Sequence, residues 1–238
     1  MKSYLEFTKS IIEYAGKLVF PPKCIFCSKL LGLGVQIEVC RECFNRIPFI
    51  IDYGAFIEKF LHGTDAMSIW FDRIFCMCEY KGIIKQSIMR YKYFGKAHYY
   101  RTFAMIMADK LKEMINISEF DIIISVPLHK QRERKRGYNQ SLLISAELGR
   151  IMNISEKSRL LVRERYTDTQ SLLHKNERYL NVKNAFRVTN ENEVKGKSIL
   201  LVDDVLTTGY TLNECSRMLK DSGAEKVYAV VIAAALHI

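Results

Sequence analysis

The chain has 238 residues, and apolar side chains make up 49% of them, which is enough for a substantial core and argues against intrinsic disorder. Its formal net charge of +10 favours anionic partners such as phosphorylated metabolites, nucleic acid or an anionic membrane face, without choosing among them. No apolar run approaches the ~18 residues of a membrane helix and no secretory pattern opens the chain, so we expect a cytoplasmic protein whose seven cysteines are reduced or metal-bound.

The N-terminal part of the chain reads as a helix followed by two small segments. Residues 4–20 have the pattern of an amphipathic helix, which we expect to pack on the protein itself, with a membrane surface as the alternative. Pro21 and Pro22 end this helix. The predicted organisation is an N-terminal helix over 1–20, a cysteine module over 21–50, an irregular connector over 51–72 and a main domain over 73–238.

Four cysteines in the module have the spacing of a metal site. Cys24 and Cys27 form one C-x-x-C pair, Cys40 and Cys43 form a second, and twelve residues separate the two pairs. Two such turns supply the tetrahedron of thiolates that zinc prefers. A redox dithiol pair and an iron–sulfur cluster are the alternatives. Because the protein fills all four positions, we expect a structural zinc that catalyses nothing.

Predicted strands and helices alternate through the main domain. Strands are expected at 74–80, 121–126, 199–202 and 227–233, and helices over most of 83–115 with a break near Gly95, from about 140 to 151, and over 211–222. This alternation predicts an α/β fold with a doubly wound, mostly parallel sheet.

Three further cysteines are expected to be buried and chemically inert. On a strand, the side chains of Cys76 and Cys78 would share a face about 6.5–7 Å apart. Two thiolates on one zinc ion lie only about 4 Å apart, so joint ligation by this pair is disfavoured. Cys215 lies on the apolar face of the helix predicted over 211–222.

A basic loop is predicted directly after the strand at 121–126. Its cationic side chains, opposed only by Glu133, are Lys130, Arg132, Arg134, Lys135 and Arg136. Arginine forks of this kind suit the oxygens of a pyrophosphate, and the same charges could follow a nucleic-acid backbone. A solvated run of charges is the third interpretation. Residues 163–186, polar and positively charged, suit a lid that closes over a ligand, with a surface insertion as the alternative.

The segment 199–211 joins a buried strand to a helix through two acids and a hydroxyl-rich turn. Its turn contains Thr207, Thr208, Gly209 and Thr211. The helix N-terminus and the hydroxyl groups suit a phosphate, and the glycine lets the backbone approach it. Because acids beside a phosphate would repel it, Asp203 and Asp204 more plausibly hold sugar hydroxyls or a magnesium ion. A phosphorylated ribose combines these features.

This segment resembles the phosphoribosyl-pyrophosphate signature of type I phosphoribosyltransferases at every position that matters. A strand ending in Asp-Asp also occurs in response-regulator receiver domains, but there the pair lies near the chain start and no Thr-Thr-Gly-x-Thr follows. A chance strand–turn–helix with capping threonines is the remaining alternative.

Four motifs in order resemble the ComF family of competence proteins, of the ComFC type. They are the paired C-x-x-C turns, Val-Pro-Leu-His with Arg-Gly-Tyr-Asn-Gln, Thr167-x-x-Gln170 with Arg178-x-x-Asn181 and Phe186, and Val-Asp-Asp-Val-x-Thr-Thr-Gly. The resemblance covers about residues 18–236. It implies a phosphoribosyltransferase fold with an N-terminal zinc finger, and a role in natural transformation in which single-stranded DNA is taken up or handled at the cytoplasmic face of the membrane.

The family pattern also assigns roles to individual positions. The phosphoribosyl pyrophosphate would be bound, with Mg²⁺, by Asp203, Asp204, Thr207, Thr208, Gly209 and Thr211. Lys92, Arg132, Arg136, Gln170 and Arg178 match further motif positions and are candidates for contacting the pyrophosphate or forming the lid. Lys130, Arg134 and Lys135 are candidates for DNA because of the charge of the basic loop, not because of the family pattern.

Two functions follow from this resemblance, and the sequence does not decide whether the protein is catalytic. The favoured hypothesis is a protein that binds phosphoribosyl pyrophosphate and acts in DNA uptake, with single-stranded DNA and membrane-associated uptake machinery as partners. The alternative is an active transferase that joins ribose 5-phosphate to a nitrogen base or ammonia. Thr207 stands where transferases of the 6-oxopurine salvage type carry an aspartate as general base, although the orotate and amidotransferase types lack that residue. A purely structural scaffold is a third possibility.

Overall fold

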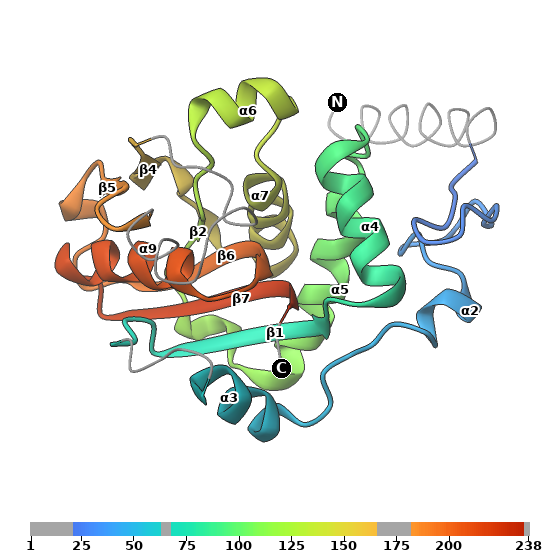
Figure 1. Cartoon of the computed structure of the whole chain (residues 1–238), viewed down its shortest axis with the longest axis horizontal. Coiled ribbons are helices and arrows are strands. Elements are labelled where there is room, and N and C mark those ends of the chain that lie inside the picture. The colour runs from blue at the N-terminus through green and yellow to red at the C-terminus, as the bar shows by residue number, and fades with distance from the viewer. Residues whose placement is uncertain (1–20, 63–67, 166–181, 236–238) are drawn as a thin grey trace, which may run out of the picture. The chain divides into compact units, whose positions relative to one another are not determined.

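The computed structural model describes residues 21–62, 68–165 and 182–235 (Figure 1). They fall into two compact units, Met1–Ile47 and Pro48–Ile238, which we call the cysteine unit and the sheet unit and describe separately. The helix predicted over 4–20 lies outside the described residues.

The sheet unit is built on parallel strands. Its described residues form a five-stranded sheet in the order β1-β7-β6-β2-β3, with every neighbouring pair parallel (Figure 1). The strands are β1 (Arg73–Glu79), β2 (Ile122–Ser125), β3 (Ser155–Glu156), β6 (Ser198–Leu206) and β7 (Lys226–Ala234). The predicted α/β fold with a mostly parallel sheet is therefore confirmed, and β3 is an addition to it.

The central strands explain why the sheet is parallel and buried. Almost every residue of β6 and β7 is buried, and both read as near-continuous runs of Val, Ile, Leu and Ala. Such runs belong to strands that helices cover on both faces. Because Ser125 of β2 pairs with Val202 of β6, the residues that follow each of them emerge at the same edge of the sheet. At this edge, the basic segment 130–136 that follows β2 lies on the same side of the sheet as Asp203 and Asp204 of β6.

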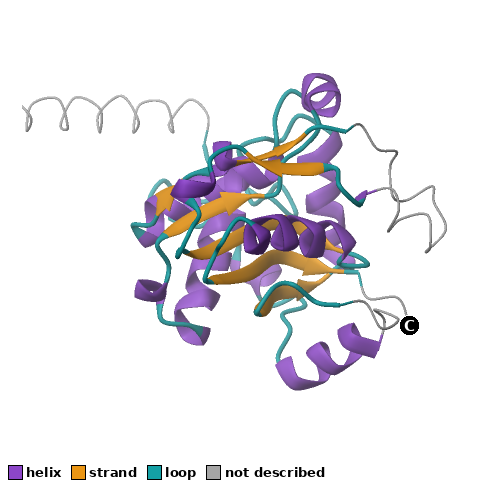
Figure 2. Ribbon diagram, turned by 90° about the vertical axis from the view of Figure 1, so that its left-hand side faces the viewer, coloured by secondary structure: helices purple, strands orange, loops and turns teal. Residues whose placement is uncertain are grey.

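Helices cover both faces of the sheet (Figures 1 and 2). They are α3 (Tyr53–His62), α4 (Gly82–Tyr93), α5 (Tyr99–Met114), α6 (Lys130–Arg136), α7 (Gln140–Met152) and α9 (Tyr210–Asp221). On one face, Leu219 of α9 and Phe60 of α3 belong to one hydrophobic cluster with Leu201 of β6. α5 and α7 pack on each other and on the sheet. Within the described ranges, each helix is too short or too polar to cross a bilayer.

Four elements differ from the sequence expectations. α3 lies inside the connector predicted to be irregular, and its buried Phe56 and Phe60 anchor it to the sheet unit. α6 replaces the predicted basic loop, since its residues are all good helix formers and Gly137 ends it in a left-handed conformation with φ +91°. An antiparallel pair, β4 (Leu161–Arg163) and β5 (Phe186–Val188), lies at the two ends of the stretch 163–186, where a lid or a surface insertion is predicted and no strand.

Candidate functional site

A tight turn joins β6 to α9 at the edge of the sheet. Asp203 and Asp204 lie near the C-terminal end of β6, which ends at Leu206, and α9 begins at Tyr210. Gly209 precedes the helix with φ +79°, a conformation that L side chains rarely adopt. The N-terminus of α9 therefore faces the same end of the sheet as the two acids, as the strand–turn–helix pattern predicted.

The connector supports this turn from behind. A Cβ atom at Gly209 would lie only 2.9 Å from Cζ of Phe60 on α3, so both the backbone angle and the packing require glycine. One turn into α9, the buried Asn213 accepts a hydrogen bond from the N–H of Trp70 at 2.8 Å and donates one to the carbonyl of Ser68 at 2.9 Å. Phe60 and Asn213 thus fix the turn and the start of α9, and nothing in the sequence pattern of the connector predicted this.

A cavity of about 830 Å³ opens beside the turn. Its walls come from the β6–α9 region, the segment from the end of β2 to the start of α7, helix α4 and strand β4, with Tyr80 and Ala235 at their margins. The charged residues among its lining are Lys85, Lys92, Arg132, Arg136, Arg163, Asp203 and Asp204. Cations outnumber carboxylates, so this cavity favours an anionic ligand.

The two acids lie in different surroundings at one end of the cavity. Asp204 forms an ion pair with the ammonium of Lys92, whose Nζ lies 2.8 Å from Oδ1, and the two side chains are only 10% and 18% exposed. Burial opposes the charge on Lys92, but Asp204 raises the pKa of Lys92 above its usual value. Asp203 Oδ1 accepts hydrogen bonds from the Ser141 hydroxyl at 2.7 Å and from the backbone N–H of Asp204 at 2.8 Å.

Burial and the neighbouring carboxylate raise the pKa of Asp203 to about 7, against the lowering effect of the Ser141 hydrogen bond. The pair therefore carries less negative charge near neutral pH than two free carboxylates would. Both acids can accept hydrogen bonds from sugar hydroxyls, and the Lys92 pair shows that this end of the cavity accommodates a cation.

Three arginines also line the cavity. Arg132 and Arg136 are four residues apart on α6 and so face the same side of that helix. Arg136 donates to Oε1 of Gln140 at 2.5 Å, and its guanidinium lies 5.2 Å from the centre of the Tyr93 ring. Arg163 is the third, on β4. Burial, together with the charge of Arg132, lowers the pKa of Arg163 to about 10. Clustered guanidinium groups are suited to a phosphate or diphosphate.

The structure brings most of the residues predicted for this site together. Those that line the cavity are Lys92, Arg132, Arg136, Asp203, Asp204, Thr207, Gly209 and Thr211. Thr208 does not line it, and its buried hydroxyl has no hydrogen-bond partner among the described residues. Gln170 and Arg178 lie outside the described residues. The three residues predicted to contact DNA, Lys130, Arg134 and Lys135, are exposed on α6 and do not line the cavity.

Sequence reasoning missed two groups at the site. Ser141 follows the Arg-Gly-Tyr-Asn-Gln motif directly, and its place at the start of α7 was the available signal. Arg163 begins the stretch 163–186 predicted to be a lid, but no pattern singled it out, because its strand pairing with β5 spans more than twenty intervening residues.

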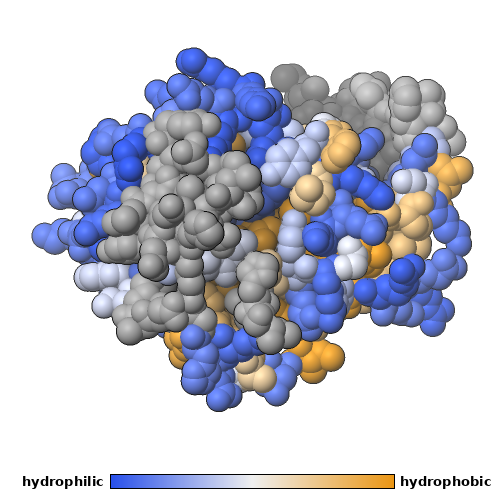
Figure 3. Space-filling view, viewed as in Figure 1, coloured by the Kyte–Doolittle hydropathy of each residue, from blue (hydrophilic) through white to orange (hydrophobic). Residues whose placement is uncertain are grey.

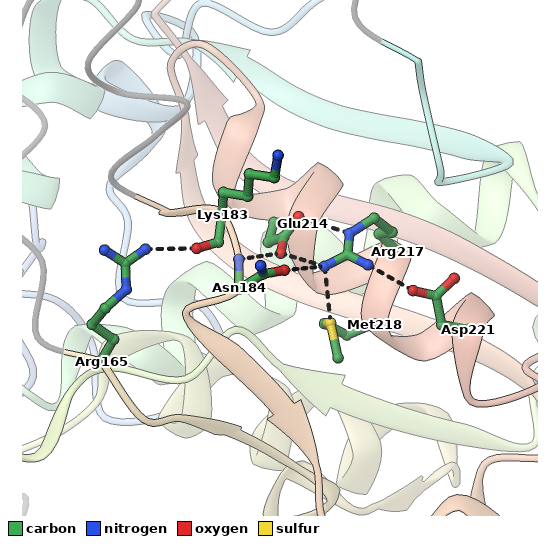
Figure 4. A network of polar contacts seen from close by, with 7 residues as sticks. All are labelled: Arg165, Lys183, Asn184, Glu214, Arg217, Met218 and Asp221. Carbon is green, nitrogen blue, oxygen red and sulfur yellow. Dashed lines mark hydrogen bonds and ion pairs between the residues drawn. The ribbon is translucent and has the colours of Figure 1, made fainter.

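A polar network fastens the start of β5 to α9 (Figure 4). The buried carboxylate of Glu214 accepts a hydrogen bond from the N–H of Asn184 at 2.6 Å and pairs with Arg217 at 2.7 Å. Arg217 also contacts Asp221 at 2.7 Å. Asn184 has a left-handed φ of +54°, which asparagine tolerates better than most residues. The chain that returns to β5 is thereby held against the helix that begins at the turn.

The cysteine unit contains a candidate metal centre. The sulfur atoms of Cys24, Cys27, Cys40 and Cys43 all lie within 4.8 Å of one another, and the Sγ atoms of Cys27 and Cys40 are 3.7 Å apart. Four thiolates about 2.3 Å from a zinc ion would be separated by about 3.8 Å, so the cluster fits tetrahedral zinc. Helix α2 (Arg41–Phe44) begins directly after Cys40 and places Cys43 one turn further.

The other cysteines are part of the core. Cys76, Cys78 and Cys215 are buried, as predicted, and burial raises the pKa of Cys78 to about 12. Burial likewise raises the pKa of Cys76 and of Cys215 well above the usual value. Thiols held protonated in this way are poor nucleophiles and poor metal ligands.

Comparison with known proteins identifies relatives of this arrangement. A model of the family described as "Phosphoribosyl transferase domain" matches residues 101–237. Competence protein F of Haemophilus influenzae is 32% identical over 216 residues, which are 86% of this chain and 93% of that protein. The DNA utilization protein YhgH of Escherichia coli O157:H7 is 43% identical over 107 residues, 45% of this chain and 46% of that protein. A solved glutamine phosphoribosylpyrophosphate amidotransferase from B. subtilis, complexed with ADP and GMP, is 19% identical, with a TM-score of 0.41, and the match covers 60% of this chain and 30% of that one.

Proposed function

Since the chain belongs to the phosphoribosyl transferase domain family and to its ComF type, we propose that it binds phosphoribosyl pyrophosphate in the cavity and acts in DNA uptake. The observation that carries this proposal is the convergence, on one cavity, of the β6–α9 turn, the acid pair and the arginines of α6 and β4. Each of these suits a different part of a single ligand.

The 5′-phosphate belongs at the turn. The first N–H groups of α9 and the hydroxyl groups of Thr207 and Thr211 are donors, and the helix end carries a partial positive charge. The ribose hydroxyls then donate to Asp203 and Asp204. The diphosphate is directed to the arginine side, where Arg132 faces the cavity. Mg²⁺ bound to the diphosphate would supply further neutralisation of its charge, and the two acids are oxygen donors of the kind that Mg²⁺ prefers.

The DNA part of the proposal is supported by the names of the relatives and by charge. One relative is named a competence protein and another a DNA utilization protein. On α6, Lys130, Arg134 and Lys135 are exposed on the side that does not line the cavity, where they suit a phosphate backbone. We propose single-stranded DNA as a partner, at the cytoplasmic face of the membrane together with membrane-associated uptake machinery.

A transferase activity is the second candidate, favoured by one observation. Tyr93, which lines the cavity, is 58% exposed and could stack on the planar base that accepts the ribose phosphate. In that reaction an acceptor nitrogen would form a bond to the anomeric carbon while the bond to pyrophosphate breaks and the acceptor proton leaves. Thr207 cannot take that proton at neutral pH, so the reaction would rely on an acceptor that needs no base at this position. Release of pyrophosphate with ammonia or a free base, abolished in Asp204→Asn, tests it.

Calorimetric titration tests the binding proposal directly. Magnesium phosphoribosyl pyrophosphate titrated into the full chain should give a saturable isotherm. Asp204→Asn should weaken binding by tenfold or more, because the variant loses a charged hydrogen-bond acceptor, an interaction worth about 1.5–3 kcal/mol. Lys112→Gln, an exposed change on α5, is the control and should bind like the parent. An isotherm that is flat for the parent at millimolar ligand, or equal for the parent and Asp204→Asn, would exclude this site.

The metal of the cysteine unit is proposed to be zinc with a structural role. All four ligand positions are filled by thiolates of one short segment, which leaves none for a substrate. Against burial, backbone N–H groups lower the pKa of the Cys24 thiol to about 7, whereas burial and the neighbouring thiols raise the pKa of Cys43, so a metal ion would have to displace protons from the cluster.

A further inference from the structure

The last turn of α4 presents apolar side chains to solvent. Phe94 and Tyr93 are 69% and 58% exposed, the highest values for aromatic side chains among the described residues, and Met89 one turn earlier is 40% exposed. In Figure 3, hydrophobic atoms lie at the surface over the upper end of α4, next to hydrophilic ones. Exposed aromatic rings gathered in this way are typical of a surface that contacts a partner.

Met89 and Phe94 border a groove of about 710 Å³, which we call the α4 groove. Its lining consists of Gly82, Lys85, Gln86, Met89, Arg90, Phe94 and Lys96. The set contains three cations and no acid, beside one aromatic ring and one thioether. The groove therefore offers positive charge and flat apolar surface together, along a path about as long as α4.

The α4 groove and the ligand cavity share a wall. Lys85 and Met89 line both hollows, and they are four residues apart on the same side of α4. Tyr93, a further four residues along, lines the cavity, whereas Phe94 lines the groove. A chain molecule lying in the groove would thus pass the mouth of the cavity at Lys85 and Met89.

We propose that the α4 groove binds a single-stranded nucleic acid, with a base stacked on Phe94 and the backbone beside Lys85 and Lys96. The rings suit the faces of unpaired bases and the cations suit phosphates. Only Met89 and Phe94 of the lining carry large apolar side chains, which suits the stacking of single bases better than insertion into a lipid surface. The cationic rim without acids and the aromatic ring together favour a nucleic acid over an acidic peptide, which would need the charge but not the stacking surface. This inference rests on the DNA part of the proposed function and adds to the cations of α6 a second contact surface, beside the cavity.

The shared wall has a thermodynamic consequence. If a ligand in the cavity changes the affinity of the groove for a strand, the strand must change the affinity of the cavity for that ligand by the same factor. Lys85 faces both sites, so occupation of one alters the charge available to the other.

Binding of a fluorescent oligo-dT of about 20 nucleotides to the full chain, followed by anisotropy over a series of salt concentrations, tests the inference. Phe94→Ala should weaken binding roughly fivefold or more while leaving the salt dependence unchanged, because stacking involves no counterions. Lys96→Gln should reduce the slope of log K against log salt by about 0.7. Lys112→Gln, on α5, is the matched charge control and Phe94→Tyr the conservative variant, and both should behave like the parent.

The outcomes separate the alternatives. Parental affinity in Phe94→Ala, or a parental slope in Lys96→Gln, overturns the proposal. A slope that falls only in Arg134→Gln assigns the strand to α6 and overturns it as well. Loss of binding to vesicles containing anionic lipid in Phe94→Ala, with oligo-dT binding retained, assigns the groove to a membrane. Titration of phosphoribosyl pyrophosphate into the same variants without DNA reports on the cavity alone. If this ligand does not bind, the proposed ligand of the cavity is refuted, while the proposal for the α4 groove is unaffected.

Discussion

Replacing Lys92 by methionine removes the ammonium that faces Asp204 while it keeps most of the apolar stem. In the parent the two side chains lie 2.8 Å apart and are 18% and 10% exposed, so solvent screens their charges little. The variant leaves the Asp204 carboxylate without this partner in a largely buried position. The adjacent Asp203 is also buried, so the two neighbouring carboxylates disfavour each other's negative charge. We therefore expect Lys92→Met to destabilise the sheet unit.

The expected magnitude follows from the burial of the pair. Removing one partner of a buried ion pair costs about 3–5 kcal/mol, and the partial exposure of Lys92 places this case near about 3 kcal/mol. That is a large part of the roughly 5–15 kcal/mol by which proteins are stable. Because the pKa of Lys92 is raised, the contribution of its charge is fully present at pH 7 and is lost as the pH rises through that raised pKa, above the usual lysine value of 10.5.

Urea unfolding at pH 7, followed by circular dichroism, measures this cost. The midpoint of Lys92→Met should fall by roughly 1 M, given slopes of about 3 kcal/mol per molar urea for a domain of this size. Lys85→Met is the matched control: it lies on the same helix and lines the same cavity but is exposed, so it should change stability by less than about 0.5 kcal/mol.

A double-mutant cycle decides whether the pair itself is responsible. Asp204→Asn alone leaves the ammonium unpaired, whereas Lys92→Met combined with Asp204→Asn leaves neither charge. The double variant should therefore be more stable than the sum of the two single effects predicts, by about 2 kcal/mol. Additive effects, or a Lys92→Met variant as stable as the Lys85→Met control, would refute the reasoning and show that the carboxylate finds another partner.

Three further outcomes are expected. Burial and the adjacent carboxylate raise the pKa of Asp203 to about 7, so the folded state prefers the protonated acid; this contribution to stability is present below about pH 4 and is lost as the pH rises through 7. In urea unfolding, Asp203→Asn should therefore be more stable than the parent by about 1 kcal/mol at pH 8 and should lose this advantage at pH 5. Equal unfolding curves for the two proteins at both pH values would contradict the assignment. Gly209→Ala should cost about 1–3 kcal/mol more than Gly196→Ala in thermal unfolding, because both have a positive φ but only the first would bring a Cβ to 2.9 Å from an aromatic ring. Metal analysis should find about one zinc per chain, lost in Cys43→Ser and kept in Cys215→Ala, and zinc retained in Cys43→Ser would exclude the four-cysteine site.

Local patterns carried enough information to predict the centre of the fold. β6, the turn and α9 are contiguous in sequence, and each has its own local pattern. An apolar run predicts the strand, two acids and a glycine mark the turn, and an apolar period of 3.6 residues predicts the helix. The same holds for the cysteine unit, where spacing alone brings four thiols together. Parallel pairing then explains why residues after β2 and β6 share one edge.

Features that depend on distant partners were not predictable in this way. Arg163 reaches the cavity because β4 pairs with β5, more than twenty residues later, and no local pattern specifies that pairing. α3 was missed because its helical pattern is short and its aromatic residues suggested an irregular connector, although Phe60 packs against the glycine of the turn. The salt bridge of Lys92 joins residues 112 positions apart.

The order of the two acids along β6 has a mechanical consequence. Neighbouring side chains on a strand point to opposite faces, and here Asp203 lies near Cys215 of α9 whereas Asp204 meets Lys92 of α4. A sugar that engages both carboxylates would join the helices of one layer to those of the other across the end of the sheet. Occupancy of the cavity should then slow amide hydrogen exchange in α4 and α9 together, although the two helices lie on different sides of the strand that carries the acids.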